Sequence, residues 1–370
     1  MSMDRKSTYR REGPARRQDQ SRQNPGRQEQ GHGRRLHGLG ENPALAKKLA
    51  KLSPERLSQK DLPTADFSVQ IAPRGLMEPL LEELGPRALA VRGRAVLTLG
   101  TRPAVWAQNV WTDPFWLPVS SIKDAARQLC ARQRNWRAHQ FFESGLNRRA
   151  ALIEEALPHI SSRPFHFGDP LPKAPMGGFL LWDANLLLAS CATTSPFADG
   201  EVHFEENKED PPGRAYLKLW ESFTLLEKKP GPGDLCIELG AAPGSWTWVL
   251  AKTGCHIFSL DKAPLAEHIG SLPNVEHCLG SGFALTPDLV GSADWLFSDM
   301  ICYPSRLYSL VTQWIEAGAM QHALCTIKFQ SATDHEMLAK FLAIPGSRIL
   351  HLSCNKHELT WFWEAPDKAI

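Results

Sequence analysis

The chain lacks paired cysteines: it has eight cysteines, and no two of them stand at the C-x-x-C spacing. Several, among them Cys236 and Cys325, lie within or beside apolar segments that are predicted to be strands. Scattered cysteines of this kind are typical of reduced thiols buried in a cytosolic protein. The sequence therefore argues against a disulfide framework and a zinc site. It shows no other metal-ligand spacing, so we expect no metal.

Long apolar runs and a large net charge are also missing. No run approaches the ~18 consecutive apolar residues of a membrane span. The Arg- and Gln-rich N-terminus has no apolar core of the kind found in a secretory signal. We therefore expect a cytoplasmic protein that does not enter a membrane. The formal net charge is only +2, which says little about partners.

The distribution of charge is more informative than its sum. Residues 1–40 hold ten Lys and Arg against four Asp and Glu, with few large aliphatic residues. Such a segment cannot bury enough apolar surface to offset the entropy lost on ordering. Residues 1–60 are therefore interpreted as a disordered basic tail, in which 43–60 can form a short helix. The tail is either an arm that binds nucleic acid by releasing counterions or a solvated segment without such a role.

Residues 64–200 mix strands and helices in an irregular order, which indicates a separate, smaller α+β domain. The assignments rest on alternation of apolar residues for strands and on helical spacing for helices. The expected strands are 67–72, 88–91 with 95–99 as a hairpin, and two within 179–192, and the expected helices are 76–84 and 121–130.

One part of this domain combines arginines with aromatic residues, and Glu143 is the only acid between Arg127 and Arg149. Arginine neutralises phosphate and flat rings stack on bases, so this composition suits RNA. The other interpretation is a solvated helix face whose aromatic residues lie in the core. The candidate RNA-binding residues are Arg132, Arg134, Trp136, Arg137, Arg148 and Arg149, together with Arg214 further along the chain.

An acidic, proline-containing linker at 200–212 leads to the C-terminal domain, residues 213–370. Apolar strands alternate there with helices, which is the pattern of a doubly wound, mostly parallel α/β sheet. The last two strands, 348–352 and 359–363, have no helix between them and are expected to form an antiparallel pair. Ligands of such sheets bind beyond the carboxyl ends of the strands.

The first strand of this sheet, residues 234–239, runs into the turn Gly240-Ala-Ala-Pro-Gly244 and then into a helix. The two glycines allow the backbone to pass close to a ligand. Asp261 ends the second strand, where an acid can accept hydrogen bonds from ribose hydroxyls. The turn lacks G-x-G-x-x-G, which argues against a dinucleotide, and it lacks G-K-[ST], so it is not a P-loop.

The segment Glu238-Leu-Gly-Ala-Ala-Pro-Gly-Ser-Trp246 resembles the S-adenosylmethionine-binding motif of the FtsJ-like ribose 2′-O-methyltransferases. The resemblance extends from Arg214 to about Glu364. It implies a Rossmann-like methyltransferase fold and S-adenosylmethionine as cofactor. The cofactor-binding residues that it implies are Glu238, Gly240, Ala242, Pro243, Gly244, Ser245, Trp246, Asp261, Ser281 and Asp299.

Four more segments are similar to the catalytic motifs of that family and stand in the family's order. Arg214-Ala-Tyr-Leu-Lys218 resembles the segment with the first lysine, and Ser298-Asp299-Met300 resembles the aspartate motif. Thr326-Ile-Lys328 resembles the second lysine motif and His357-Glu358 the glutamate motif. The resemblance therefore implies RNA as the substrate and Lys218, Asp299, Lys328 and Glu358 as the catalytic residues.

Some segments look more like the RlmM subgroup, which methylates a cytidine ribose in large-subunit ribosomal RNA. They are Ser195-Pro-Phe, 299–304 and Gln313-Trp. That subgroup places a ferredoxin-like and THUMP-type RNA-binding region before the catalytic domain, and residues 64–200 would be a shortened or diverged version. Two positions depart from the family. Ser281 stands where the family usually has an acid near the adenine, and Ile301-Cys-Tyr-Pro304 replaces its Pro-Asn step.

Methyl transfer to a ribose hydroxyl requires that the hydroxyl lose its proton as the new bond forms. Lys328 is the candidate base. A free lysine has a pKa of ~10.4; burial and a second cation, Lys218, would lower it, whereas Asp299 and Glu358 would oppose that change. Lys328 is therefore either the base or a charged group that only positions the hydroxyl.

Two other functions fit parts of the sequence. A methyltransferase-like module that binds RNA without activity would agree with the departures at Ser281 and 301–304. A nucleotide-dependent oxidoreductase would share the sheet, but the absent G-x-G-x-x-G and the final antiparallel pair argue against it. The sequence leaves open the modified nucleotide, the form of the RNA substrate and the oligomeric state.

Overall fold

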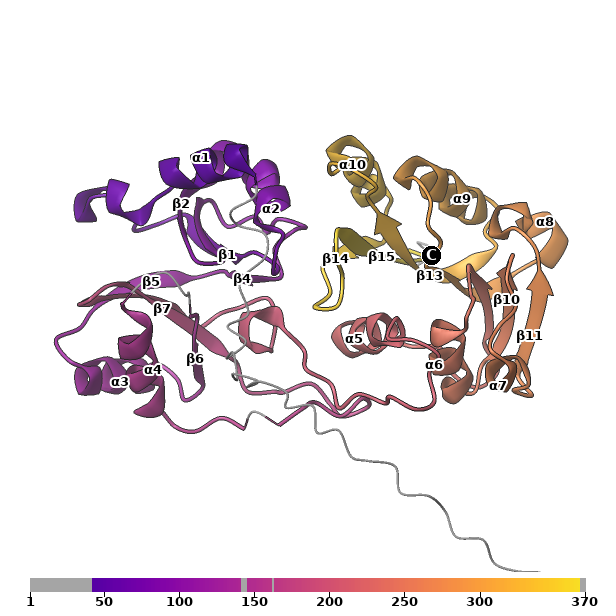
Figure 1. Ribbon diagram of the computed structural model, residues 1–370, viewed down its shortest axis with the longest axis horizontal. Coiled ribbons are helices and arrows are strands. Elements are labelled where there is room, and N and C mark those ends of the chain that lie inside the picture. Colours follow the sequence, from indigo (N-terminus) through magenta and orange to yellow (C-terminus); the bar gives the residue numbers. More distant parts are fainter. Residues whose placement is uncertain (1–41, 141–144, 162, 367–370) are drawn as a thin grey trace, which may run out of the picture. The chain divides into compact units, whose positions relative to one another are not determined.

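The computed structural model describes residues 42–140, 145–161 and 163–366 (Figure 1). These residues form two four-stranded sheets and one seven-stranded sheet, each with helices packed on it. Short 3₁₀ helices in the described residues are Pro54–Arg56, Gln59–Asp61, Gly85–Arg87, Ala198–Gly200 and Gly282–Ala284.

The predicted basic tail, residues 1–60, lies mostly outside the described residues. The short helix expected within 43–60 is present as α1, Pro43–Lys51, which corrects the extent of the predicted disordered tail. Asn42 caps that helix by accepting hydrogen bonds from the backbone N–H groups of Ala44 and Leu45. Leu45 is buried in the core, and this burial adds to the cap in holding the segment ordered.

The first sheet contains β1 (Phe67–Ile71), β2 (Ala88–Arg92), β3 (Ala95–Leu99) and β4 (Asn109–Trp111), and α2 (Met77–Leu84) connects β1 to β2. The strand order is β2-β3-β1-β4, and every neighbouring pair is antiparallel. The predicted strand, helix and hairpin are therefore confirmed. A loop without a helix connects β3 to β4, so this run lacks the second helix of a β-α-β-β-α-β ferredoxin-like motif.

The second sheet contains β5 (Pro114–Pro118), β6 (Trp136–Ala138), β7 (Gly177–Asp183) and β8 (Leu186–Ser190), with α3 (Ile122–Cys130) and α4 (Asn147–Glu155). Its order is β5-β8-β7-β6. Successive side chains of a strand point to opposite faces. Phe179 and Leu181 accordingly pack with the two helices, whereas Leu180 and Trp182 pack with residues of the first sheet.

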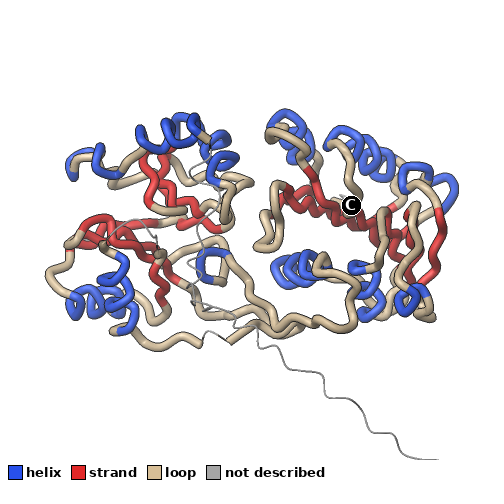
Figure 2. The backbone as a smooth tube through the Cα atoms, in the orientation of Figure 1, coloured by secondary structure: helices blue, strands red, loops and turns tan. Residues whose placement is uncertain are grey.

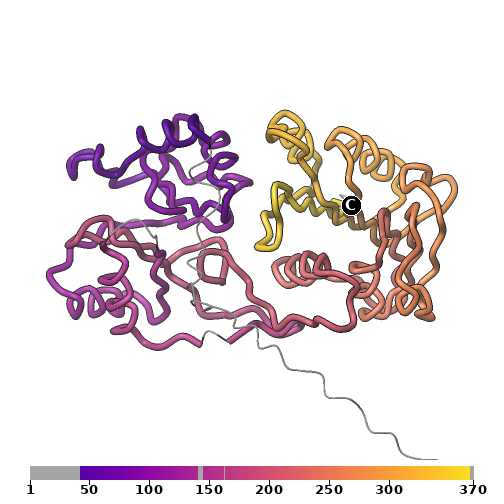
Figure 3. Tube along the Cα trace, viewed as in Figure 1, coloured from indigo at the N-terminus to yellow at the C-terminus, as the bar shows by residue number. Residues whose placement is uncertain are grey.

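The third sheet contains β9 (Leu235–Leu239), β10 (His256–Asp261), β11 (Val275–Leu279), β12 (Ala293–Ser298), β13 (Met320–Lys328), β14 (Ser347–Leu350) and β15 (Glu358–Glu364). The order is β11-β10-β9-β12-β13-β15-β14, and the first five strands are parallel. The end of the chain folds back beside β13, with β15 antiparallel to both neighbours (Figure 3). The predicted doubly wound α/β fold with a C-terminal antiparallel pair is therefore confirmed.

Helices cover both faces of the seven-stranded sheet (Figures 1 and 2). One face carries α5 (Tyr216–Leu226), α6 (Ser245–Thr253) and α7 (Glu267–Gly270), and the other carries α8 (Pro287–Val290), α9 (Pro304–Glu316) and α10 (His335–Ala343). Alternation along the central strands supplies both cores. Ile237 packs on the face with α9, and its neighbour Cys236 packs on the face with α5.

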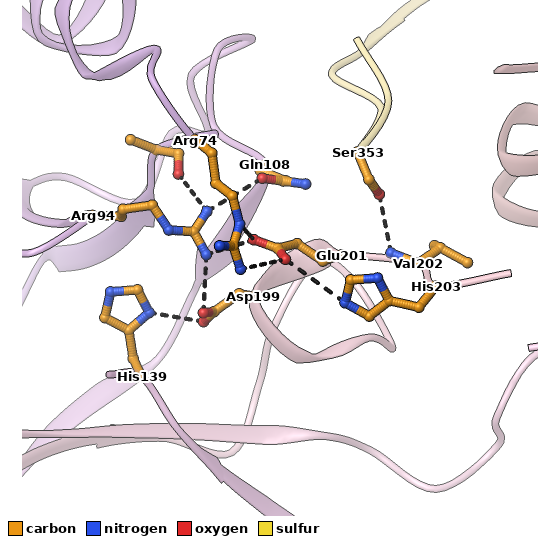
Figure 4. A network of polar contacts seen from close by, with 10 residues as sticks. Arg74, Arg94, Gln108, His139, Asp199, Glu201, Val202, His203 and Ser353 are labelled. Carbon is orange, nitrogen blue, oxygen red and sulfur yellow. Dashed lines mark hydrogen bonds and ion pairs between the residues drawn. The ribbon is translucent and has the colours of Figure 1, made fainter. Parts of the chain in front are cut away.

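A network of charged side chains ties the turn between β2 and β3 to the segment that leads into the third sheet (Figure 4). Arg94 donates hydrogen bonds to Asp199 at 3.1 Å and to Glu201 at 2.7 Å. The next residue, Val202, donates its backbone N–H to Ser353 Oγ at 3.0 Å. Partly buried carboxylates need such partners, so the network fixes the course of this connecting segment.

Candidate active site

Four charged side chains from distant parts of the chain meet beyond one edge of the seven-stranded sheet. Lys218 Nζ lies 3.0 Å from Asp299 Oδ1 and 2.7 Å from Glu358 Oε1. Lys328 Nζ lies 3.0 Å from the same Asp299 oxygen and also donates to the backbone carbonyl of Asp299. The four side chains are between 10% and 19% exposed. All four predicted catalytic residues are thus in one cluster, and their roles in a reaction remain proposals.

Topology explains why these residues meet. Parallel strands end at the same edge of a sheet, and Asp299 follows β12 while Lys328 ends the neighbouring β13. β15 runs in the opposite direction, so its first residue, Glu358, pairs directly with Lys328. Lys218 lies on the first turn of α5, which packs on the same sheet.

The cluster is neutral in sum, with two ammonium and two carboxylate groups. Burial raises the pKa of Asp299, but the ammonium groups of Lys218 and Lys328 outweigh that effect and hold its pKa below the ordinary value. Burial likewise lowers the pKa of Lys218, yet the charges of Asp299 and Glu358 raise it above the ordinary value. Asp299 is therefore ionised and Lys218 protonated at neutral pH.

The turn after β9 brings the backbone close to this cluster. Gly240 has φ +82°, and a Cβ atom there would lie 2.5 Å from Cγ of Met300, the residue after Asp299. Gly244 has φ +110° and is the N-cap residue of α6, and a Cβ there would lie 2.8 Å from Ile269 Cγ2. Both positions therefore require glycine on grounds of conformation and of space. The Ala242–Pro243 peptide bond between them is cis.

Three residues of the predicted cofactor motif point their side chains into the protein. Glu238 accepts a hydrogen bond from Thr247 Oγ1 at 2.7 Å, and burial raises its pKa to about 8. Ser245 Oγ donates to the carbonyl of Gly213, and Trp246 Nε1 donates to the carbonyl of Ala215. The polar atoms of these side chains build the strand–turn–helix unit, and cofactor binding by these three residues stays a prediction.

Asp261 and Ser281 lie at the ends of the neighbouring strands. The Asp261 carboxylate accepts hydrogen bonds from the backbone N–H groups of Ala242 and Ala263 at 3.1 and 3.0 Å. A carboxylate has about four lone-pair sites, so Asp261 retains acceptor capacity for a further donor. Ser281 precedes the 282–284 turn after β11 and is partly exposed.

The predicted RNA-binding patch is only partly available to a ligand. Trp136 is 1% exposed, and its Nε1 donates to the carbonyls of Leu129 and Gln133. The prediction that Trp136 stacks on a base is therefore wrong, because its ring fills the core of the second sheet. Phe141 and Phe142 lie outside the described residues. The other interpretation of this segment, in which its aromatic residues lie in the core, is correct for Trp136.

The arginines of that patch differ in their partners. Arg137 pairs with Glu154 at 3.0 Å, Arg132 lies over the Phe115 ring, and Arg214 pairs with Glu206 at 2.7 Å. Arg134 donates to Asn135, Arg148 is exposed, and Arg149 is partly buried. These arginines therefore do not form one uniform unpaired surface.

Sequence reasoning missed Glu221, which lies one turn after Lys218 on α5. Its carboxylate accepts hydrogen bonds from the backbone N–H and the hydroxyl of Ser353 at 2.8 and 2.6 Å. Burial raises the pKa of Glu221 to about 7. The available signal was an acidic residue among the apolar residues of a helix whose composition predicts burial.

Within the described part of the chain, no helix is long and apolar enough to cross a membrane. In the same residues, no group of three or more His, Cys, Asp or Glu side chains is placed to hold a metal ion.

Comparison with known proteins shows what the C-terminal part is similar to. Residues 212–335 match the family model described as FtsJ-like methyltransferase, so the predicted resemblance is confirmed for this segment. Curated relatives of this chain include proteins named Ribosomal RNA large subunit methyltransferase M. That of Thauera aminoaromatica is 32% identical over 167 residues, which cover 41% of this chain and 45% of the relative. That of Azoarcus sp. (strain BH72) is 37% identical over 165 residues, which cover 40% of this chain and 45% of the relative.

The chain thus spans less than half of the length of the curated relatives that it matches. Among solved structures, a putative ribosomal RNA methyltransferase from Plasmodium falciparum is 16% identical, with a TM-score of 0.31, covering 41% of this chain and 96% of that one. This similarity is too low to support a fold assignment. The fold is assigned from the order and direction of the strands.

Proposed function

We propose that this protein transfers the methyl group of S-adenosylmethionine to a ribose 2′-hydroxyl of RNA, with large-subunit ribosomal RNA as its substrate and the cytoplasm as its location. The observation that carries the proposal is the cluster in which Asp299 contacts both Lys218 and Lys328 while Glu358 contacts Lys218. The match of residues 212–335 to FtsJ-like methyltransferases supports it.

The residues at the carboxyl edge of the sheet fit S-adenosylmethionine. Gly240 and Gly244 remove side-chain bulk from the turn after β9. Asp261 keeps free acceptor sites for ribose hydroxyls, and Ser281 offers a hydroxyl in place of the family's acid at the next strand end. When bound, the cofactor supplies the methyl group from a positively charged sulfonium. Asp299 and Glu358 offset the charges of the two lysines, so the cluster adds no net positive charge that would oppose a bound cation.

In the proposed mechanism the charged cluster holds the substrate hydroxyl in line for attack. Two of the contacts of Lys328 go to Asp299, which fixes the position of its Nζ. Lys328 then contacts the hydroxyl. Either it is a neutral amine that accepts the hydroxyl proton, or it is an ammonium that only orients the hydroxyl, whose proton then passes to solvent water. Lys218 and Glu358 hold Asp299 and the β15 end in place. Alignment of reacting groups is itself worth several powers of ten in rate.

The first test is Lys328→Ala, measured as methyl transfer to ribosomal RNA and as affinity for S-adenosylmethionine. We expect cofactor affinity to stay within about three-fold and turnover to fall by at least about 10³-fold, since alignment and proton transfer are both lost. Lys340→Ala is the matched control, because Lys340 is exposed on α10 and pairs only with Glu336 in the described structure. Near-wild-type turnover of Lys328→Ala would refute the assigned role.

Lys328→Arg separates the two roles of Lys328, because a guanidinium keeps the charge but does not accept a proton at neutral pH. Appreciable turnover in this variant would favour orientation over proton transfer. Mapping of ribose methylation in ribosomal RNA from cells with and without the gene tests the substrate, and an unchanged map would rule out ribosomal RNA.

An inactive RNA-binding module is the second candidate, and the serine at position 281 favours it. Titration calorimetry with S-adenosylmethionine separates the two candidates. Heat of binding supports the enzyme, whereas neither heat nor competition by a cofactor analogue supports the inactive module.

A further inference from the structure

An aromatic cluster joins the first sheet to the strands that carry Lys328 and Glu358. Its centre is Trp106, in the loop between β3 and β4, whose side chain is fully buried. The Trp106 ring stacks on His357 with centroids 5.3 Å apart and rings 18° from parallel. It also lies 5.7 Å from the ring of Phe329 and 5.7 Å from that of His351.

The partners of Trp106 flank two residues of the charged cluster. Phe329 directly follows Lys328, and His357 directly precedes Glu358. The backbone N–H of Phe329 donates to the carbonyl of His357 at 3.3 Å, which extends the ladder one step beyond the Lys328–Glu358 pair. Neighbouring side chains of a strand point to opposite faces of the sheet. Phe329 and His357, with Trp106 packed on them, therefore lie on the face opposite to Lys328 and Glu358.

The loop that carries Trp106 is itself held firmly. The backbone N–H groups of Val105 and Trp106 donate to the two carboxylate oxygens of Glu83 on α2, at 2.9 and 3.1 Å. The N–H of Ala104 donates to the side chain of Gln70 in β1 at 2.8 Å. The Trp106 ring therefore presents a fixed surface to the end of the β13–β15 ladder. The position of the ring is set by contacts with α2 and β1.

We propose that Trp106 is a positioning residue, which holds the end of β13 and the start of β15 so that Lys328 and Glu358 meet Asp299 and Lys218. This inference rests on the proposed function for its effect on turnover. Strand ends open more readily than strand centres, and Lys328 and Glu358 are the terminal residue pair in the register of β13 and β15. A displacement of about 1 Å in a reacting group can cost about 10²-fold in rate.

Trp111 provides a matched control for Trp106. It is 1% exposed, so its truncation leaves a cavity of similar size. Its ring lies against Gly178 of β7, where a Cβ would be 2.4 Å from the Trp111 ring. Trp111 therefore tests the loss of a buried tryptophan from the same part of the chain without contact to Phe329 or His357.

The experiment compares Trp106→Leu, Trp106→Phe and Trp111→Leu in the full chain. We expect both leucine variants to lower the melting temperature by similar amounts and to keep S-adenosylmethionine affinity within about three-fold. Trp106→Leu should lower kcat by about 10-fold or more with little change in KM for RNA. Trp106→Phe should recover most of kcat because it restores a ring against His357. Equal losses of kcat in Trp106→Leu and Trp111→Leu, or no loss in Trp106→Leu, would overturn the proposal.

Amide hydrogen exchange tests the same idea without any activity. The Phe329 amide should exchange at least about 10-fold faster in Trp106→Leu than in the wild type, and at an unchanged rate in Trp111→Leu. If Trp106→Leu does not fold, Glu83→Gln replaces it, since it loosens the loop and keeps the ring, and the same exchange increase is expected. A wild-type chain that methylates no RNA would defeat the proposed function, whereas unchanged exchange at Phe329 would defeat the role of Trp106.

Discussion

At the scale of single residues, Asp299 determines the state of the charged cluster. One carboxylate oxygen contacts two ammonium groups, and the Asp299 backbone carbonyl accepts from Lys328 as well. Removing one member of a partly buried ion cluster leaves the others without compensation, which costs more than the intact pairing gains. Asp299 is therefore the position where stability and the proposed chemistry depend on the same atoms.

The variant Asp299→Asn should lower the free energy of unfolding by about 3 kcal/mol at pH 7, because Lys218 and Lys328 lose their shared anion. The lowered pKa of Asp299 means that its stabilisation is present above the ordinary pKa of 3.8 and is lost as pH falls through the lower folded value. The difference between wild type and variant should thus shrink in acid.

Urea unfolding of both proteins at pH 7 and below pH 4 measures this difference. Asp288→Asn, an exposed position in α8, is the control and should change stability little at either pH. A difference between wild type and Asp299→Asn that stays constant with pH would contradict the ion-cluster account.

At the scale of secondary-structure elements, β15 decides where the glutamate of the cluster lies. It enters the sheet between β13 and β14 and runs antiparallel to both. The short turn before β14 allows this arrangement. Gly346 in that turn has φ +87°, and a Cβ there would lie 2.1 Å from the carbonyl oxygen of Glu364 at the far end of β15.

The variant Gly346→Ala should lower the free energy of unfolding by about 3 kcal/mol or more, because the methyl group adds a clash with backbone to the strain of a positive φ. Gly318→Ala is the matched control, since Gly318 follows the C-terminus of α9 with φ +62° and has nothing within 4 Å of the added Cβ. It should lose only about 1 kcal/mol. Equal losses in the two variants, measured by chemical denaturation, would show that β15 does not approach Gly346 as described.

At the scale of the whole molecule, Ser353 connects segments that lie more than a hundred positions apart. Its hydroxyl accepts from the backbone N–H of Val202 and donates to Glu221 on α5 (Figure 4 shows the contact with Val202). The carboxyl of Glu221 is nearly fully buried, and burial raises its pKa to about 7 from an ordinary 4.5. Ionisation of this one group therefore acts on a junction of several elements.

The variant Glu221→Gln should become more stable relative to wild type as pH rises. A carboxyl whose folded pKa is raised loses stability between its unfolded and folded pKa values, so the loss for wild type falls between pH 4.5 and about 7. The gain of the variant between pH 5 and pH 8 should be about 2 kcal/mol. Thermal unfolding across this range measures it. Glu336→Gln, an exposed position on α10, should show no such trend, and a flat profile for Glu221→Gln would refute the buried junction.

Local patterns of apolar residues predicted most of the helices and strands. The alternation of strands and helices in 213–370 indicated the doubly wound sheet, and the absence of a helix between the last two strands indicated their antiparallel pairing. Both follow from side-chain periodicity and from connection length, which are local properties. The meeting of Lys218, Asp299, Lys328 and Glu358 was predicted by resemblance together with the rule that parallel strands share a carboxyl edge.

Other features of the site were not predictable in this way. Trp136 and Trp246 are of a residue type that often contacts ligands, but whether each is buried depends on which face of its helix or strand meets the core. The pairing of Arg137 with Glu154 and the contact of Trp106 with His357 join residues 17 and 251 positions apart. No local pattern encodes such contacts.

By itself the amino-acid sequence determined the class of fold and the residue types available at the carboxyl edge of the sheet, because periodicity and turn chemistry act over a few residues. Only the tertiary structure decided which side chains remain accessible and which are buried in a core, and it placed a tryptophan of the β3–β4 loop behind Lys328 and Glu358. The physical reason is that burial and long-range pairing depend on distances through space, which the order of residues does not specify.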